Sequence, residues 1–149
     1  RVVCLNRQRN IVLDESGVLR KFGVGPESIP DYLALVGDSA DGIPGVPGWG
    51  AKTSSLVLSR FHHIEGIPDD ASKWGIAPRG AASAANSLAE RRTDAMLYKD
   101  LATLRLDVPL SESLADLEWR GVPHQTYEDL CTEMGSSRLT GLPHRWAAG

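Results

Sequence analysis

The stretch that decides the fold runs from Ile29 to Thr53 and reads IPDYLALVGDSADGIPGVPGWGAKT. Its first residues place apolar side chains at helical spacing after Ser28, a suitable N-cap, and this helix must end by Gly37. Glycine and proline are then so frequent up to Gly50 that no regular element can persist. A helix restarts at Ala51 and is predicted to reach about Phe61. The region therefore predicts two helices joined by a long loop.

The loop is predicted to be ordered. Ile43, Val46 and Trp49 place an apolar side chain at every third position, which is not the pattern of a low-complexity linker.

The rest of the chain is predicted to be mostly helical behind a pair of strands. Two short β-branched runs indicate strands at Val2–Leu5 and Ile11–Leu13, and Asp14 can cap a short helix that stops at Gly23. Helices are also expected over residues 80–92, 93–104 and 125–134, the second of them with Leu97, Leu101 and Leu104 as its apolar stripe.

Composition restricts the class of protein. The chain has 149 residues, 42% of them hydrophobic, and a formal net charge of -3 that is concentrated in the last third. No apolar run approaches the ~18 residues of a membrane span and no signal-peptide pattern is visible, so we expect a soluble cytoplasmic protein without a membrane partner. Cys4 and Cys131 have no metal-ligand spacing and are expected to be free, buried thiols.

Asp38 and Asp41 lie three residues apart in the loop, where both carboxylates can point toward one spot. Such hard oxygen ligands suit Mg²⁺ or Mn²⁺. The alternative is that the two aspartates only cap turns. An EF-hand is excluded, because the twelfth position is Trp49 counted from Asp38 and Lys52 counted from Asp41, where a glutamate is required.

The segment Gly48–Thr53 combines two glycines with the start of a helix. A phosphate can approach glycine closely, and the first N–H groups of a helix are unpaired and favour an anion. Lys52 and Thr53 add a charge and a hydroxyl. Such a hairpin would hold a nucleic-acid backbone without reading bases. The alternative is a glycine-rich turn that packs two helices, and neither a dinucleotide fingerprint nor a P-loop is present.

Residues 29–53, together with LYKDLATLRLDVPL at residues 97–110, resemble the bacterial 5′-3′ exonuclease and flap endonuclease family, which includes the nuclease domains of type I DNA polymerases. The resemblance spans about residues 1–110. It implies a mostly α fold: a helix-three-turn-helix domain, similar to a helix-hairpin-helix, attached to the last strands of an α/β nuclease domain. The implied segments are 1–24 for the terminal strands and helix of that domain, 25–110 for the DNA-binding region and 111–149 for a helical extension.

The resemblance also implies the site. Asp38 and Asp41 correspond to acids of a two-metal site that holds Mg²⁺ or Mn²⁺, with no catalytic residue beyond the metal ligands. The remaining ligands lie upstream, which agrees with a chain that opens without an initiator Met inside an apolar run. A K⁺ ion bound by loop carbonyls is implied at the hairpin. The implied DNA-binding residues are Gly45, Val46, Gly48, Trp49, Gly50, Lys52 and Thr53.

The implied substrate is DNA with a 5′ flap, a branch or a nick, and a polymerase domain can follow in the parent protein. Arg79, Arg91, Arg92 and Lys99 are further candidates for phosphate contacts, unless they belong to a solvated helix face.

The chain departs from the family pattern at two places. Trp49 stands where a smaller aliphatic residue is usual, and His62 and His63 replace the usual glycine after the helix. Asp31 is interpreted as a helix cap or as part of a solvated face.

Two other classes of function remain open from the sequence. One is a non-catalytic DNA-binding module that keeps the hairpin without the missing acids. The other is a protein-interaction domain in which the hairpin only packs.

Overall fold

The computed structural model describes residues 3–147. The chain forms two compact units that divide after Arg105, and each is described by itself. Within the described residues, the first unit contains the strand pair and five α-helices, and the second contains one α-helix. The prediction of a mostly α protein is confirmed. The division into 1–24, 25–110 and 111–149 stays a prediction.

The first unit opens with a small antiparallel ribbon, β1 (Cys4–Asn6) and β2 (Ile11–Leu13), in which Leu5 pairs with Val12. Helix α1 (Glu15–Phe22) follows directly. The Asp14 carboxylate accepts a hydrogen bond from the Gly17 amide at 2.8 Å, and Gly23 ends the helix in the left-handed conformation. Both predicted ends of α1 are therefore confirmed.

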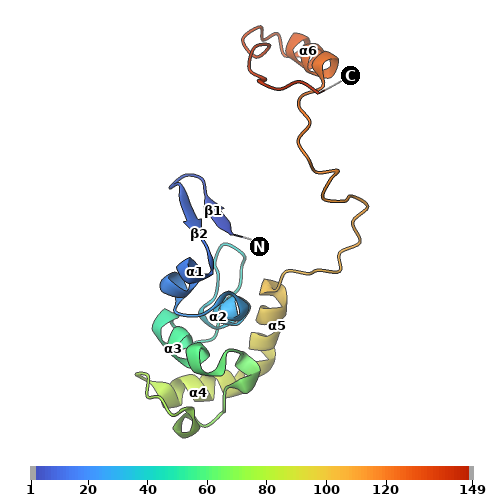
Figure 1. Ribbon diagram of the computed structural model, residues 1–149. Coiled ribbons are helices and arrows are strands. Elements are labelled where there is room, and N and C mark those ends of the chain that lie inside the picture. The colour runs from blue at the N-terminus through green and yellow to red at the C-terminus, as the bar shows by residue number, and fades with distance from the viewer. Residues whose placement is uncertain (1–2, 148–149) are drawn as a thin grey trace. The chain divides into compact units, whose positions relative to one another are not determined.

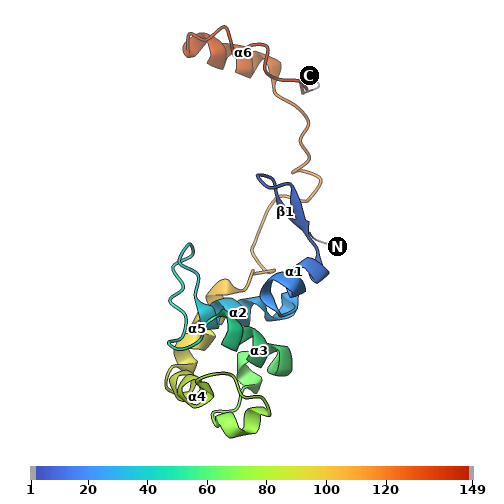
Figure 2. The ribbon, with the colours of Figure 1, turned by 90° about the vertical axis from the view of Figure 1, so that its left-hand side faces the viewer.

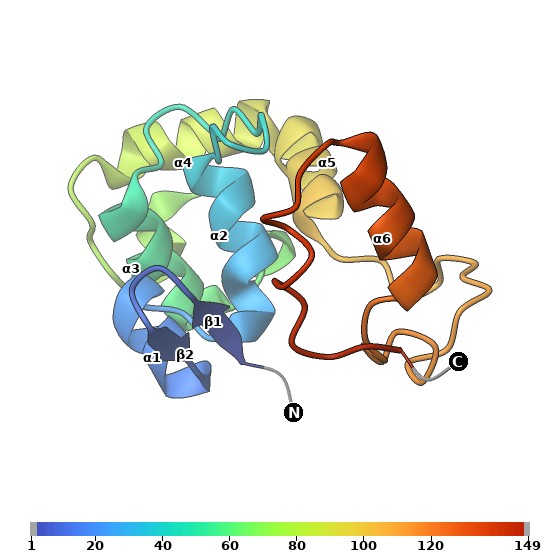
Figure 3. The same ribbon diagram turned by 90° about the horizontal axis from the view of Figure 1, so that it is seen from above.

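Helix α2 (Ile29–Val36) begins after a short 3₁₀ turn, η1 (Pro26–Ser28). Ser28 takes the N-cap position but makes no side-chain capping bond, and it is buried. Figures 1 and 3 show α2 at the centre of the first unit, between α3 and α5. Ala34 and Leu35 on α2 are fully buried and form the middle of the core.

The other helices of the first unit surround α2. They are α3 (Ala51–Phe61), α4 (Ala81–Glu90) and α5 (Arg92–Ala102), with the short 3₁₀ turns η2 (Ile64–Gly66) and η3 (Ala71–Trp74) between α3 and α4. Ile43, Val46 and Trp49 are buried, which confirms that the loop before α3 is ordered. Figure 2 shows this loop leaving α2 and folding back on itself before α3 begins.

The predicted apolar stripe of α5 is wrong. Leu97, Leu101 and Leu104 are 55%, 67% and 88% exposed, whereas Ala95 is fully buried and Lys99 is largely buried. The reason is that α5 is oriented by an ion pair from Lys99 to α2, described below, and this pair faces inward. The inward side of α5 therefore carries Ala95 and Lys99, and the partly buried Met96 and Tyr98 also pack against the core.

The second unit contains α6 (His124–Glu133) and an aromatic cluster. Val122 forms a parallel bridge to Trp146, and the Trp146 ring lies 4.5 Å from the ring of His124 and 5.8 Å from that of Tyr127 between ring centres. Cys131 is buried here, but Cys4 is exposed on β1, so the prediction of two buried thiols is wrong for Cys4. Within residues 3–147, no helix has the length and apolar character needed to cross a membrane.

Candidate metal-binding loop and nucleic-acid interface

The loop between α2 and α3 begins with a tight hairpin. The Asp38 amide donates to the Ile43 carbonyl at 2.9 Å, and the Ile43 amide donates back to the Asp38 carbonyl at 2.8 Å. The Asp38 carboxylate also accepts from the Ala40 amide at 2.9 Å. These bonds fix the backbone of Asp38 and place Asp41 near the exposed tip, so the structure brings the two predicted metal ligands onto one closed turn.

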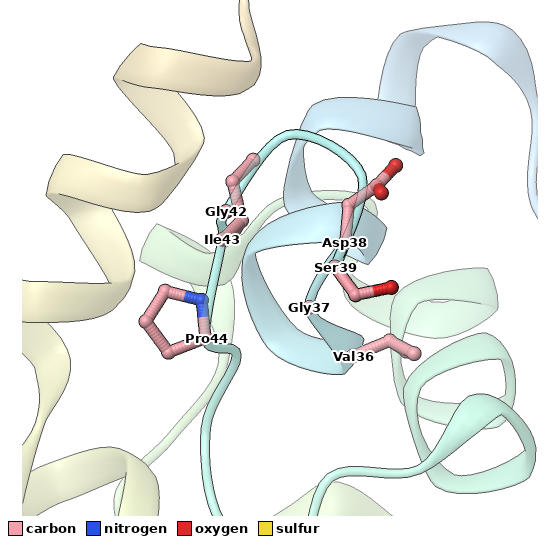
Figure 4. A pocket seen from close by; sticks show the side chains of 7 residues that line it. All are labelled: Val36, Gly37, Asp38, Ser39, Gly42, Ile43 and Pro44. Carbon is pink, nitrogen blue, oxygen red and sulfur yellow. The ribbon is translucent and has the colours of Figure 1, made fainter.

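A hollow of about 490 Å³ lies at the base of this hairpin. Figure 4 shows the side chains of Asp38 and Ser39 on one side of the loop, with Ile43 and Pro44 across from them. Asp38 lines the hollow, but Asp41 does not.

The two carboxylates suit part of a divalent-metal site. Mg²⁺ is commonly held by one or two carboxylates, with waters and substrate phosphates filling the other positions. Asp38 and Asp41 provide such oxygens on a loop that faces solvent. Among the residues that the structure describes, no group of three or more histidine, cysteine or acidic side chains is placed to hold a metal ion. The pair therefore fits as a contributor to a larger site.

Two glycines let the loop pack against the end of α2. Gly45 has a φ of +76°, and a Cβ there would lie 2.7 Å from the carbonyl group of Val36 and from the amide nitrogen of Gly37. Gly37 has a φ of +88° and faces the Ile43 and Pro44 carbonyls equally closely. The Val46 amide then donates to the Leu35 carbonyl at 2.8 Å. The position of the loop is thus set by backbone contact with α2.

The turn before α3 is open on its outer side. Gly48, with a φ of +83°, and Gly50 have no atom within 4 Å of the position that a Cβ would occupy. Gly50 is the N-cap of α3 and provides no side chain for the first N–H groups of the helix. Lys52 is exposed and Thr53 is half-buried on this first turn. These residues leave room for an anion at the helix start.

Val46 and Trp49 face the other way. Both are 3% exposed, and the indole N–H of Trp49 donates to the Ala84 carbonyl of α4 at 2.9 Å. Only backbone groups at these two predicted DNA-binding positions can therefore face a ligand. The sequence already contained a sign of this, since both residues belong to the apolar repeat of the loop.

A buried carboxylate holds the other end of α3, and the sequence interpretation missed it. Asp31 on α2 is completely buried and accepts from the His63 ring at 3.0 Å, from the Ile64 amide at 2.9 Å and from the Lys99 ammonium at 2.9 Å. The interpretation of Asp31 as a cap or a solvated residue is wrong. Its place one turn before the fully buried Leu35 was the available signal.

Lys99 and Arg92 are occupied by internal partners, so their assignment as phosphate contacts is wrong. Lys99 also bonds both carboxylate oxygens of Glu65 at 2.8 Å. Burial lowers the pKa of Lys99, but the hydrogen bonds to Glu65 and Asp31 outweigh it and raise the pKa above its usual value. Arg92 donates to the Ile64 and Ile67 carbonyls at 2.8 Å and to Asp69 at 2.6 Å.

The bonds made by Asp31 and Arg92 hold a strained turn at His62. This residue has φ and ψ of 62° and -45°, and the His63 amide donates across it to the Phe61 carbonyl at 2.6 Å. That geometry is a γ-turn of the rare, strained kind. His62 thus takes a positive φ at the position after α3, where the sequence departs from the usual glycine. The strain persists because Asp31 and Arg92 fix the residues that follow.

The first unit is thus a small helical domain in which two helices present an acid-bearing, glycine-rich loop. A family model described as the C-terminal SAM fold of 5′-3′ exonuclease matches residues 24–125. The chain belongs to this 5′-3′ exonuclease family.

Relatives of this chain include proteins named 5′-3′ exonuclease and DNA polymerase I. The 5′-3′ exonuclease of Buchnera aphidicola subsp. Schizaphis graminum is 39% identical over 108 residues, which is 72% of this chain and 38% of that protein. DNA polymerase I of Pseudomonas aeruginosa is 37% identical over 124 residues, covering 78% of this chain and 13% of the polymerase. DNA polymerase I of Bacillus subtilis is 33% identical over 122 residues, covering 82% of this chain and 13% of the polymerase. The chain therefore spans well under half of the length of these relatives.

Proposed function

We propose that this chain is the DNA-binding helical part of a metal-dependent 5′-3′ exonuclease or flap endonuclease. The observation that carries the proposal is the turn at Gly48–Gly50, which is open outward and leads directly into the unpaired N–H groups of α3, with Lys52 exposed beside it. Contacts of this kind go to phosphates, so binding should depend on salt and on DNA shape rather than on base sequence. A duplex with a 5′ flap, a branch or a nick is the proposed substrate.

Asp38 and Asp41 are the proposed contribution of this chain to the metal site. The bonds that close the Asp38–Ile43 hairpin support this role, because they hold the Asp38 backbone in place with its carboxylate in a solvent-facing hollow. When bound, Mg²⁺ or Mn²⁺ ions supply a nucleophilic water and stabilise the leaving oxygen in phosphodiester hydrolysis. The other ligands would come from a part of the parent protein outside these residues.

A K⁺ ion at the hairpin belongs to the same proposal, held by backbone carbonyls near Gly45, Val46 and Trp49. The Val46 carbonyl already accepts the Trp49 amide at 3.0 Å, which fixes its direction and leaves a second lone pair for a cation. Replacing K⁺ with a larger organic cation at constant ionic strength should weaken DNA binding if this ion is present.

The experiment that tests DNA binding compares Lys52→Ala with Lys73→Ala. Lys73 is also exposed but lies on η3 and not on the turn at Gly48–Gly50. Fluorescence anisotropy with a nicked 5′-flap duplex should show weaker binding for Lys52→Ala at low salt. The plot of log affinity against log salt concentration should also be less steep for Lys52→Ala, by about 0.9 for the one lost phosphate contact. Equal affinity and slope for the two variants would contradict the proposed interface.

The metal assignment has its own test. Mn²⁺ binding to the chain with flap DNA, followed by electron paramagnetic resonance, should weaken at least tenfold in the double variant Asp38→Asn, Asp41→Asn. Asp94→Asn on α5 removes a charge elsewhere and should leave Mn²⁺ binding unchanged. If the double variant binds Mn²⁺ as the wild type does, the chain is better described as a DNA-binding module without a metal role.

A further inference from the structure

The turn at Gly48–Gly50 is attached to the domain by one side chain. Gly48 and Gly50 have none, so Trp49 alone connects this turn to the core. Its ring is 3% exposed, and its N–H donates to the Ala84 carbonyl in the middle of α4. The loop is also fixed earlier, at Gly45 and Val46, but that contact is with α2.

Helix α4 is built to receive this ring. Its buried face carries the small residues Ala84 and Ala85, each 2% exposed, which let the indole approach the helix backbone. The Trp49 ring also lies 5.7 Å from the Trp74 ring, between centres, and Trp74 is itself fixed by a bond from its N–H to the Pro68 carbonyl at 2.8 Å. A smaller aliphatic residue at position 49 would leave part of this space unfilled and could not donate a hydrogen bond.

The hydrogen bond from Trp49 to Ala84 fixes the orientation of the indole ring, which burial alone would not. An apolar side chain can rotate or slide within a pocket, whereas a buried N–H that loses its acceptor pays a desolvation penalty. The bond to Ala84 therefore resists movement of the turn relative to α4. Glycine restricts the backbone least, so this bond adds to the backbone bonds at Trp49 and Gly50 in setting where the outer face of the turn lies.

We propose that Trp49 is a positioning residue for DNA binding, which holds the Gly48–Gly50 turn on α4 in the conformation that accepts a backbone phosphate. The inference rests on the proposed function. Trp49 touches no DNA in this scheme and acts through the two glycines and the start of α3. An ordered turn binds at a lower entropic cost than a mobile one, so loss of the restraint should lower affinity without removing a charge.

The test compares Trp49→Phe with Trp74→Phe in the 149-residue chain. Both tryptophans are buried in the same core and both donate an indole N–H to a backbone carbonyl, but only Trp49 lies on the turn. With flap duplex in anisotropy experiments, Trp49→Phe should weaken binding about three- to tenfold, the effect of one lost hydrogen bond. Trp74→Phe keeps an aromatic ring beside Trp49 and loses only the bond to Pro68, which lies off the turn, so its binding should stay within twofold of the wild type. Circular dichroism establishes that both variants are folded.

Amide hydrogen exchange measured by NMR gives a second readout. The residue 49 amide donates to the Val46 carbonyl and the Ser54 amide to the Gly50 carbonyl, so both report on the turn. Both should exchange several times faster in Trp49→Phe and at the wild-type rate in Trp74→Phe. If Trp49→Phe does not fold, exchange of the wild-type indole N–H decides instead: adding duplex DNA should slow it for Trp49 and not for Trp74.

The outcomes separate this inference from the function on which it rests. A wild-type chain that does not bind duplex DNA would refute the proposed function and the inference with it. A wild-type chain that binds, together with a Trp49→Phe variant of equal affinity, would refute the inference alone. Equal losses in the two variants would show that Trp49 only stabilises the core, and they too would overturn it.

Discussion

Asp31→Asn tests the buried network that fixes α2, α5 and the end of α3. The substitution keeps the shape of the side chain and one oxygen that can accept from the Ile64 amide. It removes the negative charge and replaces one acceptor oxygen with an N–H₂ group. The oxygen that accepts from the Ile64 amide also accepts from Lys99, so the N–H₂ group would take the other position and face His63, whose ring can serve as an acceptor.

The expected cost follows from the three bonds. A hydrogen bond to a charged group contributes about 1.5–3 kcal/mol, and breaking a buried ion pair by removing one partner costs about 3–5 kcal/mol. Relief from burying the Asp31 charge offsets part of this, and Lys99 keeps its bond to Glu65. We therefore expect Asp31→Asn to lower the free energy of unfolding by about 2–4 kcal/mol.

The assay is urea unfolding followed by tryptophan fluorescence, because Trp49 and Trp74 report on the core of the first unit. Asp100→Asn is the matched control, since it removes the same charge from an exposed position on α5 and should change stability by less than about 0.5 kcal/mol. If Asp31→Asn is also within about 0.5 kcal/mol of the wild type, Asp31 does not hold the fold as argued.

Three further predictions concern pH and backbone conformation. Burial raises the pKa of Glu65, but the bond from Lys99 outweighs it and holds the pKa below 4.5, whereas the pKa of Lys99 lies above 10.5. The ion pair therefore contributes its full stability between pH 4.5 and 10.5. That contribution is lost as pH falls through the lowered pKa of Glu65 or rises through the raised pKa of Lys99. In urea titrations, the difference in stability between the wild type and Glu65→Gln should therefore shrink below pH 4.5. At the γ-turn, His62→Val should lower the melting temperature and His62→Gly should not, because a β-branched residue tolerates a φ of 62° least. Equal melting temperatures for the two variants would argue against the strained turn. Gly45→Ala should lower the free energy of unfolding by about 3 kcal/mol or more, and Gly48→Ala by about 1–2 kcal/mol. Both glycines have a positive φ, but only Gly45 faces backbone atoms. A larger loss for Gly48→Ala in calorimetry would contradict the packing of the loop on α2.

Local signals predicted the helices better than the contacts between them. The cap at Asp14, the stop at Gly23 and the bounds of α3 depend on nearby residues, and all agree with the structure. The buried face of α5 does not follow from its own leucines, because the pairing of Lys99 with Asp31 on a distant helix decides which face turns inward. A sequence period shows that a helix has an apolar face but not which partner it meets.

The sequence predicted the loop between α2 and α3, but it predicted only in part which of its side chains face the core. Glycine spacing located the open turn, and the apolar repeat indicated burial of Val46 and Trp49. The Asp31 cluster was hidden, because it joins α2 to η2 and α5, and no spacing along the chain relates these segments.

The ribbon β1–β2 has a consequence for handling the chain in solution. Val3, Leu5, Ile11 and Val12 are exposed, and over residues 3–147 the sheet consists of β1 and β2 alone. Unpaired strand edges with apolar side chains are templates for aggregation. The apparent molecular mass from light scattering should therefore rise with protein concentration, and this rise should be smaller when Leu5 and Val12 are replaced by lysine. Binding experiments belong at low micromolar concentration or below, where colloidal association does not imitate affinity for DNA.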